Sequence, residues 1–215
     1  MEHQPDPRTV IISSARELGL AIEEVQAEQF LRYLSHLLEW NRVINLTAIV
    51  DPNEIIIKHF VDSLAVLVTT DFTDESLVFD VGSGGGFPGI PIKIMKSGVQ
   101  LVLVEPVQKK CSFLNSVVGL LKLQEVSIFN GTIEQYGQWP LRQLIDTVVI
   151  RALKCEAIQT HISALLAAKG KVVLYRTAPM NNKEMWKDFH LVDEKILMLP
   201  QGAGKRVVSV IQRNT

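Results

Sequence analysis

Apolar residues in the first third of the chain recur at the spacing of one helical face. Phe30, Leu34, Leu37 and Leu38 follow the i, i+4, i+7, i+8 pattern of an amphipathic helix. No alternating strand pattern interrupts residues 1–70. We therefore predict a helical segment over 1–70, packed on a second unit formed by residues 71–215.

A further helix start lies inside this segment. Asp51 has the residue type of an N-cap, Pro52 suits the first helical position, and Glu54 completes a capping box. The helix that follows would bury one apolar face, formed by Ile56, Phe60, Leu64 and Leu67.

Beyond residue 76 the pattern changes to short apolar runs separated by helical stretches. This alternation predicts an open, mostly parallel α/β sheet with helices on both faces. The tail has no room for a helix between its last two β-prone runs, 191–199 and 206–212, and this favours a closing antiparallel hairpin. The predicted parallel strands are 77–81, 101–104, 126–129, 147–150 and 172–175, and the predicted crossover helices are 88–96, 107–121 and 155–168, the last stopped by residues 169–171.

A glycine-rich turn follows the first predicted strand. Residues 84–89 read Gly-Gly-Gly-Phe-Pro-Gly, a G-x-G-x-x-G pattern between a strand and a helix. Glycine permits positive φ and close approach of a ligand, and a helix start offers unpaired amides. The pattern alone fits either a dinucleotide or S-adenosylmethionine. Asp80 before the turn favours the cationic methionine of the latter, because a carboxylate would repel a pyrophosphate, and the terminal hairpin favours it too.

Polar residues follow the other predicted strands at the same edge, where open α/β sheets bind ligands. Glu105 ends the second strand and is suited to accept both ribose hydroxyls of an adenosine. Ile133 and Glu134 follow the third strand, where they could cover an adenine or simply begin a helix. Arg151 follows the fourth, either as a solvated cation or as a group that grips a carboxylate or phosphate.

Two further sets are candidates for chemistry or binding. His59 and Asp62 lie three residues apart on a predicted helix and could act together, although a histidine on an apolar helix face more often has only a packing role. Scattered cations could form a basic rim for phosphates, or could simply be solvated. They are Lys93, Lys109, Lys110, Lys154, Arg176, Lys205 and Arg206.

Composition narrows the class of protein. At 215 residues and 47% apolar, the chain can bury one good core, and its net charge of −1 gives no global attraction to nucleic acid. Two cysteines without metal spacing suit a reducing compartment and predict no metal site. Because no leader pattern and no long apolar run is present, we expect a cytoplasmic protein without a membrane segment.

The motifs together resemble the GidB/RsmG family, bacterial methyltransferases of small-subunit (16S) ribosomal RNA that modify N7 of a guanine. The resemblance rests on residues 40–47 (WNRVINLT), on His59 with 62–64 (DSL), on 80–91 (DVGSGGGFPGIP), on 103–105 (LVE) with Lys109, Lys110, Phe113 and Leu114, and on Ile133, Glu134, Arg151 and Ala152. Two positions depart from the family pattern. It often has arginine where Thr132 stands and a small polar residue where Ile150 stands.

The resemblance implies a class I S-adenosylmethionine-dependent methyltransferase fold of Rossmann type. It implies that Gly82, Gly84 and Phe87 contact the methionine or adenosine part of the cofactor, that Ile133 and Glu134 contact its adenine, and that Asp80, Glu105 and Arg151 complete the site. The expected partner is 16S rRNA or the small ribosomal subunit, and the expected state is a monomer.

N7 of guanine carries an in-plane lone pair, so its methylation needs no proton removal. We therefore expect no dedicated base, with Arg151, His59 and Asp62 as the candidates for any catalytic role. A nicotinamide-dependent oxidoreductase and a non-catalytic ribosome-binding module are the alternatives.

Overall fold

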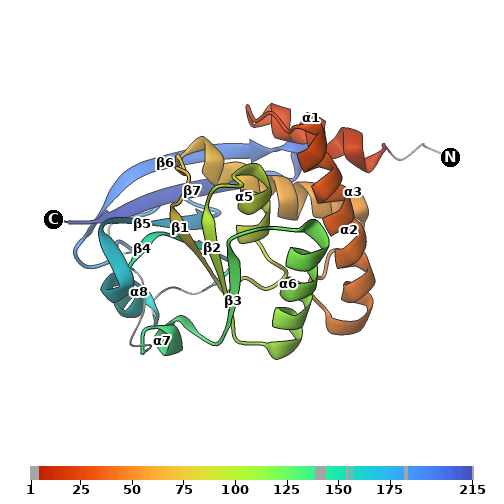
Figure 1. Ribbon diagram of the computed structural model, residues 1–215. Coiled ribbons are helices and arrows are strands. Elements are labelled where there is room, and N and C mark those ends of the chain that lie inside the picture. Colours follow the sequence, from red (N-terminus) through yellow and green to blue (C-terminus); the bar gives the residue numbers. More distant parts are fainter. Residues whose placement is uncertain (1–4, 139–143, 154, 156, 182–183, 215) are drawn as a thin grey trace.

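The computed structural model describes residues 5–138, 144–153, 155, 157–181 and 184–214. Its centre is a seven-stranded sheet in the order β3-β2-β1-β4-β5-β7-β6 (Figure 1). The first five strands pair in parallel, and β7 pairs antiparallel with both β5 and β6. The strands are β1 (Leu77–Val81), β2 (Gln100–Glu105), β3 (Val126–Asn130), β4 (Ile145–Arg151), β5 (Leu166–Arg176), β6 (Phe189–Leu199) and β7 (Gly204–Arg213).

The segment before the sheet is helical, as predicted. Asp51 accepts a hydrogen bond from the Glu54 amide and Pro52 opens α3, which confirms the predicted cap. The apolar face predicted beyond it is buried at Ile56, Phe60 and Leu64 and partly buried at Leu67. The elements are α1 (Pro7–Glu17), α2 (Glu24–Ile44), α3 (Pro52–Ile55), the π-helical segment η1 (Ile56–Val61), α4 (Asp62–Leu64) and the 3₁₀ turn η2 (Ala65–Val68).

Two apolar layers cover the two faces of the sheet, because successive strand residues point to opposite sides. On one face, Leu101, Leu103 and Val149 pack with the N-terminal helices and with α5 (Gly89–Met95) and α6 (Gln108–Leu121). On the other, Phe79 and Val148 pack with α7 (Ile133–Tyr136) and α8 (Gln159–Leu165). One apolar cluster thus joins the N-terminal helices to the sheet, while the division at residue 70 stays a prediction.

The predicted helix 155–168 is wrong in its extent. Residues 159–165 form α8, and the chain then enters β5 at Leu166, so residues 169–171 lie in a strand and do not stop a helix. The pairing of β4 with β5 shifts its register between Ile145 and Thr147. At Gly170 a Cβ would lie 2.8 Å from the carbonyl oxygen of Ile145. Glycine therefore marks a close backbone approach at an irregular strand pairing.

The tail forms the predicted antiparallel hairpin, with the 3₁₀ turn η3 (Pro200–Gly202) between β6 and β7. β7 lies inside the sheet, beside β5, and β6 is the edge strand. Within the described residues, none of the helices has both the length and the apolar character that a membrane span requires. The carboxyl ends of β1 to β5 and the start of β7 meet at one edge, where the predicted site residues lie.

Candidate active site

The glycine-rich turn lies directly after β1 and is held by the end of β2. Gly82, Gly84 and Gly86 adopt φ of 78°, 56° and 90°, a conformation that glycine takes at little cost. The Glu105 carboxylate accepts the Gly84 amide at 2.8 Å through Oε2 and the Val107 amide at 2.9 Å through Oε1. Glu105 is buried, at 3% exposed. In this structure it therefore fixes the turn against β2.

Asp80 lies beneath the turn and faces the start of α5. Its Oδ2 accepts the Gly89 amide at 2.9 Å, whereas its buried Oδ1 has no partner among the described residues. Burial raises the pKa of this carboxyl group to about 7, against the lowering effects of the Gly89 bond and of Arg151. Asp80 therefore stabilises the turn through Oδ2, while its Oδ1 lacks a hydrogen-bond donor among the described residues.

The turn fits a nucleotide-type cofactor. A Cβ placed on Gly84 would meet only the Gly82 carbonyl oxygen, at 3.9 Å, so the space over the turn is open. A Cβ on Gly86 would instead lie 2.5 Å from Ile90 and 2.6 Å from the Tyr33 hydroxyl. One glycine thus leaves room for a ligand, and the other permits close packing beneath it.

Ile133 and Glu134 open α7 in the next loop along the edge. Thr132 caps this helix, and its hydrogen bond lowers the pKa of Glu134. Ile133 is 1% exposed and packs in the apolar layer, while Glu134 is partly exposed. In the described conformation, Glu134 is thus the more accessible of the two predicted adenine contacts.

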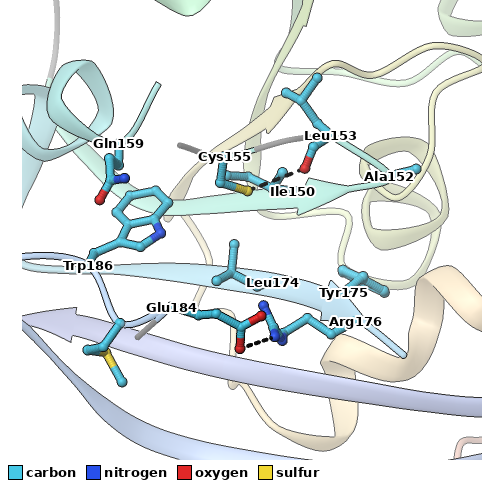
Figure 2. A pocket seen from close by; sticks show the side chains of 11 residues that line it. Ile150, Ala152, Leu153, Cys155, Gln159, Leu174, Tyr175, Arg176, Glu184 and Trp186 are labelled. Atoms are coloured by element: carbon cyan, nitrogen blue, oxygen red, sulfur yellow. Dashed lines mark hydrogen bonds and ion pairs between the residues drawn. The ribbon is translucent and has the colours of Figure 1, made fainter. Parts of the chain in front are cut away.

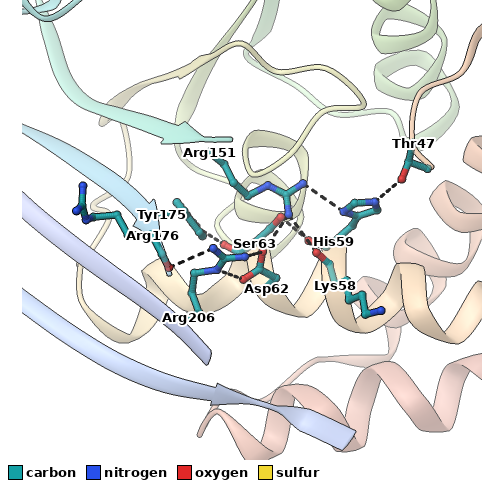
Figure 3. Close-up of polar contacts among 9 residues, drawn as sticks. All are labelled: Thr47, Lys58, His59, Asp62, Ser63, Arg151, Tyr175, Arg176 and Arg206. Carbon is teal, nitrogen blue, oxygen red and sulfur yellow. Dashed lines mark hydrogen bonds and ion pairs between the residues drawn. The ribbon is translucent and has the colours of Figure 1, made fainter. Parts of the chain in front are cut away.

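Arg151, at the end of β4, is anchored by a buried carboxylate from the N-terminal helices. Its Nη1 donates to Asp62 Oδ2 at 3.0 Å and to the Lys58 carbonyl oxygen at 3.1 Å (Figure 3). The same carboxylate accepts Arg206 Nε at 2.5 Å and Nη2 at 2.8 Å. Asp62 is 0% exposed, and a buried carboxylate needs such partners. Two guanidinium groups on one carboxylate leave a local charge of +1.

His59 connects Arg151 to the loop after α2. Its Nδ1 lies 3.3 Å from Arg151 Nη2 and its Nε2 lies 2.6 Å from the Thr47 hydroxyl (Figure 3). Burial and the neighbouring Arg151 lower the His59 pKa to about 4, so the ring is neutral at pH 7. Because a guanidinium only donates, Nδ1 accepts and the ring proton lies on Nε2, which donates to Thr47.

The ring of Phe87 packs against both His59 and Arg151. The ring of His59 stacks on Phe87 with centroids 4.8 Å apart, and the Arg151 guanidinium lies 5.2 Å from the Phe87 centroid. Phe87 also stacks on Tyr33 and is only 6% exposed. The predicted cofactor contact is therefore a buried ring that supports Arg151, with little surface offered to a ligand.

A cavity of about 630 Å³ opens over these groups. Its lining includes His59, Asp62, Arg151, Arg176 and Arg206, which come from η1, α4, β4, β5 and β7. Arg206 Nη1 donates to the Arg176 carbonyl oxygen at 3.2 Å. The structure thus brings together the three candidates for a catalytic role and two of the predicted RNA-binding cations.

The remaining predicted cations have different positions. Lys93 is buried, at 2% exposed, and its Nζ donates to the Ser97 and Val99 carbonyl oxygens at 2.7 and 2.5 Å, so its assignment to an RNA-binding rim is wrong. Lys109 and Lys110 lie in the first turn of α6, and Lys205 is exposed on β7. Lys154 lies outside the described residues.

Sequence reasoning missed the supports of His59. Asn41 donates to the Thr47 carbonyl oxygen and accepts the Thr47 amide, both at 2.9 Å, and so holds the threonine that binds His59. Both belong to the 40–47 motif, whose polar residues at a helix end were the only signal in the sequence. No pattern in the sequence predicted the ion pair between Arg176 and Glu184, whose Nη2 and Oε2 atoms lie 2.7 Å apart.

Two solved structures share the fold of this chain. A mutant of MtNAS in complex with S-adenosylmethionine matches with a TM-score of 0.60 at 14% identity, over 97% of this chain and 88% of that one. TrmN from Thermus thermophilus matches with a TM-score of 0.55 at 16% identity, over 71% of this chain and 48% of that one. These matches show that the chain has a Rossmann-like α/β fold, and one of the two proteins was crystallised with S-adenosylmethionine.

The sequence comparisons identify the family. The model of GidB, rRNA small subunit methyltransferase G, matches residues 26–204. A ribosomal RNA small subunit methyltransferase G from Carboxydothermus hydrogenoformans is 37% identical over 92% of this chain and 87% of its own length. A ribosomal RNA small subunit methyltransferase G from Clostridium botulinum strain Loch Maree is 34% identical over 82% of this chain and 74% of its own length. The chain belongs to the rRNA small subunit methyltransferase G family, which confirms the predicted resemblance and favours S-adenosylmethionine over a nicotinamide cofactor.

Proposed function

We propose that this protein transfers a methyl group from S-adenosylmethionine to N7 of a guanine in 16S rRNA, as a cytoplasmic monomer that acts on the RNA or the small ribosomal subunit. The names of its relatives support the substrate class. The atom that is modified is argued from the chemistry of the cavity at the carboxyl edge.

The observation that carries the proposal is that His59, Asp62 and Tyr175, which line this cavity, are already engaged. Both nitrogens of neutral His59 have partners, and the Asp62 carboxylate is held by two arginines. The Tyr175 hydroxyl donates to the Ser63 carbonyl oxygen, and burial raises its pKa. A site of this kind suits a nucleophile that has no proton to lose.

N7 of guanine is such a nucleophile. Bound S-adenosylmethionine supplies a methyl group on a cationic sulfur. As the new C–N bond forms, the electron pair of the breaking S–C bond stays on sulfur, so the guanine becomes cationic and no proton moves. What the chain must do is align the two reactants and keep water out.

The residues of this chain divide that task between them. The turn at Gly82 and Gly84, with its open space at Gly84 and with Glu105 and Glu134 beside it, would hold the cofactor. Asp80 and Phe87 would support the turn and Arg151 from below. Arg151 stands between the turn and the cavity, fixed by Asp62, His59 and Phe87. It would orient the RNA through a phosphate or a base oxygen.

The surplus positive charge suits an RNA backbone. Arg151 and Arg206 share one carboxylate, and Lys58, 39% exposed, lies at the rim of the same cavity. Lys109, Lys110 and Lys205 are further cations for phosphates. A chain with a net charge of −1 would thus bind RNA through a local basic face.

The test is transfer of a tritiated methyl group to small subunits from cells that lack the enzyme. We expect incorporation at one guanine, mapped by reverse-transcription stops after cleavage at 7-methylguanosine. Label on a ring carbon or an exocyclic amine, or label in no guanine, would contradict the proposal. Gly82→Asp is the inactive control, because its Cβ would meet the Leu153 side chain at 3.3 Å and the residue would be strained at φ 78°, which would distort the turn that is proposed to hold the cofactor.

A further inference from the structure

A second cavity, of about 330 Å³, lies on the other side of the same sheet edge. It adjoins the Arg151 cavity, and Ala152, Tyr175, Arg176 and Glu184 line both. Its volume is at the lower end of what proteins use for small ligands. The proposed function does not by itself assign a role to this second cavity.

Apolar side chains form one part of the wall of this cavity. Ile150 and Leu174, from the ends of β4 and β5, are 2% and 4% exposed, and the indole of Trp186 stands across from them (Figure 2). Trp186 is held edge-on by Phe189, with ring centroids 5.4 Å apart at 71°. An aromatic ring facing aliphatic side chains is a common receptor for an unstacked nucleobase.

An ion pair forms the polar rim of the cavity. Arg176 Nη2 donates to Glu184 Oε2 at 2.7 Å (Figure 2). The Asn181 amide donates to the same oxygen at 3.1 Å. These bonds lower the pKa of Glu184, so it is an ionised acceptor and a weak base. Its other oxygen, Oε1, receives no bond from the part of the chain that the structure describes. Glu184 is therefore placed to accept from a ligand.

The pair places guanidinium donors beside Glu184 Oε1, whose two lone pairs can accept, and this is the hydrogen-bonding order of a cytosine edge. Guanine presents the complement, O6 as acceptor and then N1–H and the N2 amino group as donors. Adenine presents a bare N1 acceptor at the centre of this edge, which a carboxylate repels. We propose that the Trp186 cavity binds the guanine that is methylated, with Glu184 accepting from N1–H and N2 and Arg176 donating to O6.

This assignment rests on the proposed function and explains how the atom is selected. A guanine held by its Watson–Crick edge keeps N7 on the opposite edge, free of the protein's donors. The basic cavity beside it, with Arg151 and Arg206, then receives the phosphates that flank an extruded nucleotide. Glu184 is a specificity-determining residue in this arrangement, because it selects the base without exchanging a proton.

The test is binding of guanosine monophosphate (GMP) and inosine monophosphate (IMP), which lacks only the N2 amino group. Both are titrated into the full-length protein with S-adenosylhomocysteine present. The indole N–H signal of Trp186 in NMR spectra, assigned with Trp186→Phe, reports occupancy. We expect GMP to bind the wild type about tenfold more tightly than IMP, since a good contact to a base edge discriminates by roughly 5- to 150-fold. Glu184→Gln should lower the affinity for GMP to that for IMP.

Glu39→Gln is the matched control, an exposed carboxylate on α2 far from the cavity, and should keep the preference for GMP. Equal affinities of the wild type for GMP and IMP would overturn the proposal. So would a preference that survives Glu184→Gln, or saturation with GMP at millimolar concentration that leaves the Trp186 signal unmoved. This experiment involves no methyl transfer, so a negative result would not contradict methylation at the mapped guanine. If the mapping of the methylated guanine failed, the result of the binding experiment could still be interpreted.

Discussion

Asp62 and Arg151 form a buried ion pair between segments that are 89 residues apart in the sequence, with Oδ2 and Nη1 3.0 Å apart. The carboxylate comes from the helical segment and the guanidinium from the end of β4. This pair joins the two parts of the chain at the point where chemistry is expected. Each of the following predictions changes one element of that junction or of the turn beside it.

Asp62→Asn should unfold at lower denaturant concentration, with a loss of about 3 kcal/mol in the free energy of unfolding. Removing the charge leaves two buried guanidinium groups without their anion. Urea titration followed by circular dichroism measures the change. The control is Glu54→Gln, which breaks the exposed pair with Lys58 at 2.9 Å and should cost less than about 1 kcal/mol. Equal losses in both variants would contradict the role given to Asp62.

Arg151→Lys should lower the rate of methyl transfer about a hundredfold while the protein stays folded. Lysine keeps the charge, but it cannot hold the Asp62, Lys58 and His59 acceptors at once, so the cation moves. Single-turnover transfer to small subunits measures the rate, and thermal unfolding checks the fold. A wild-type rate would show that any cation suffices at this position.

The stability of the protein should depend on His59 in mildly acidic solution. The His59 pKa is about 4 in the folded state and 6.5 in the reference state, so the unfolded chain binds the proton more readily. The contribution of His59 is complete above about pH 6.5 and is lost as the pH falls toward 4, by up to about 3 kcal/mol.

The measurement is urea unfolding of the wild type and His59→Gln at several pH values. Glutamine can keep one acceptor and one donor but does not titrate, so the difference between the two proteins isolates His59. Asp80, whose raised pKa acts in the opposite sense, is present in both. A difference that is constant from pH 4 to pH 7 would refute the shifted histidine.

Two glycines of the turn should respond differently to alanine. Gly86→Ala should cost at least about 2 kcal/mol, because its Cβ would overlap Ile90 and Tyr33 at positive φ. Gly84→Ala should cost about 1 kcal/mol, since its Cβ enters open space, yet it should weaken binding of S-adenosylmethionine. Calorimetric titration with the cofactor and thermal unfolding separate the two effects. Unchanged cofactor affinity in Gly84→Ala would place the ligand elsewhere.

Local patterns predicted the fold well where they also describe the tertiary environment. The apolar run at 77–81 became β1, because a strand buried on both faces is rich in apolar residues. The run at 126–129 became the half-exposed edge strand β3 within one residue. Gly82 and Glu105 meet because successive parallel strands end at one edge. The helix predicted over 155–168 ended early, since the pairing of β5 with β4 extended the strand into a helix-compatible sequence.

What the sequence could not predict depends on contacts between distant segments. Buried Lys93 donates to two carbonyl groups after α5, and its residue type alone does not indicate this burial. His59 owes its lowered pKa first to burial and then to Arg151, 92 residues away. The pairing of Arg176 with Glu184 depends on the loop before β6. Such relationships are decided by topology, and only the structure brings them together.

The place of β7 in the sheet has a consequence for synthesis of the protein. This strand is the last that the structure describes, yet it lies between β5 and β6 and carries Arg206 to Asp62. A nascent chain that has not yet released residues 204–213 lacks one of the two cations that neutralise a fully buried carboxylate. The folding of the site is therefore completed only after translation of this strand, so that an unfinished polypeptide on the ribosome does not yet hold the assembled pocket.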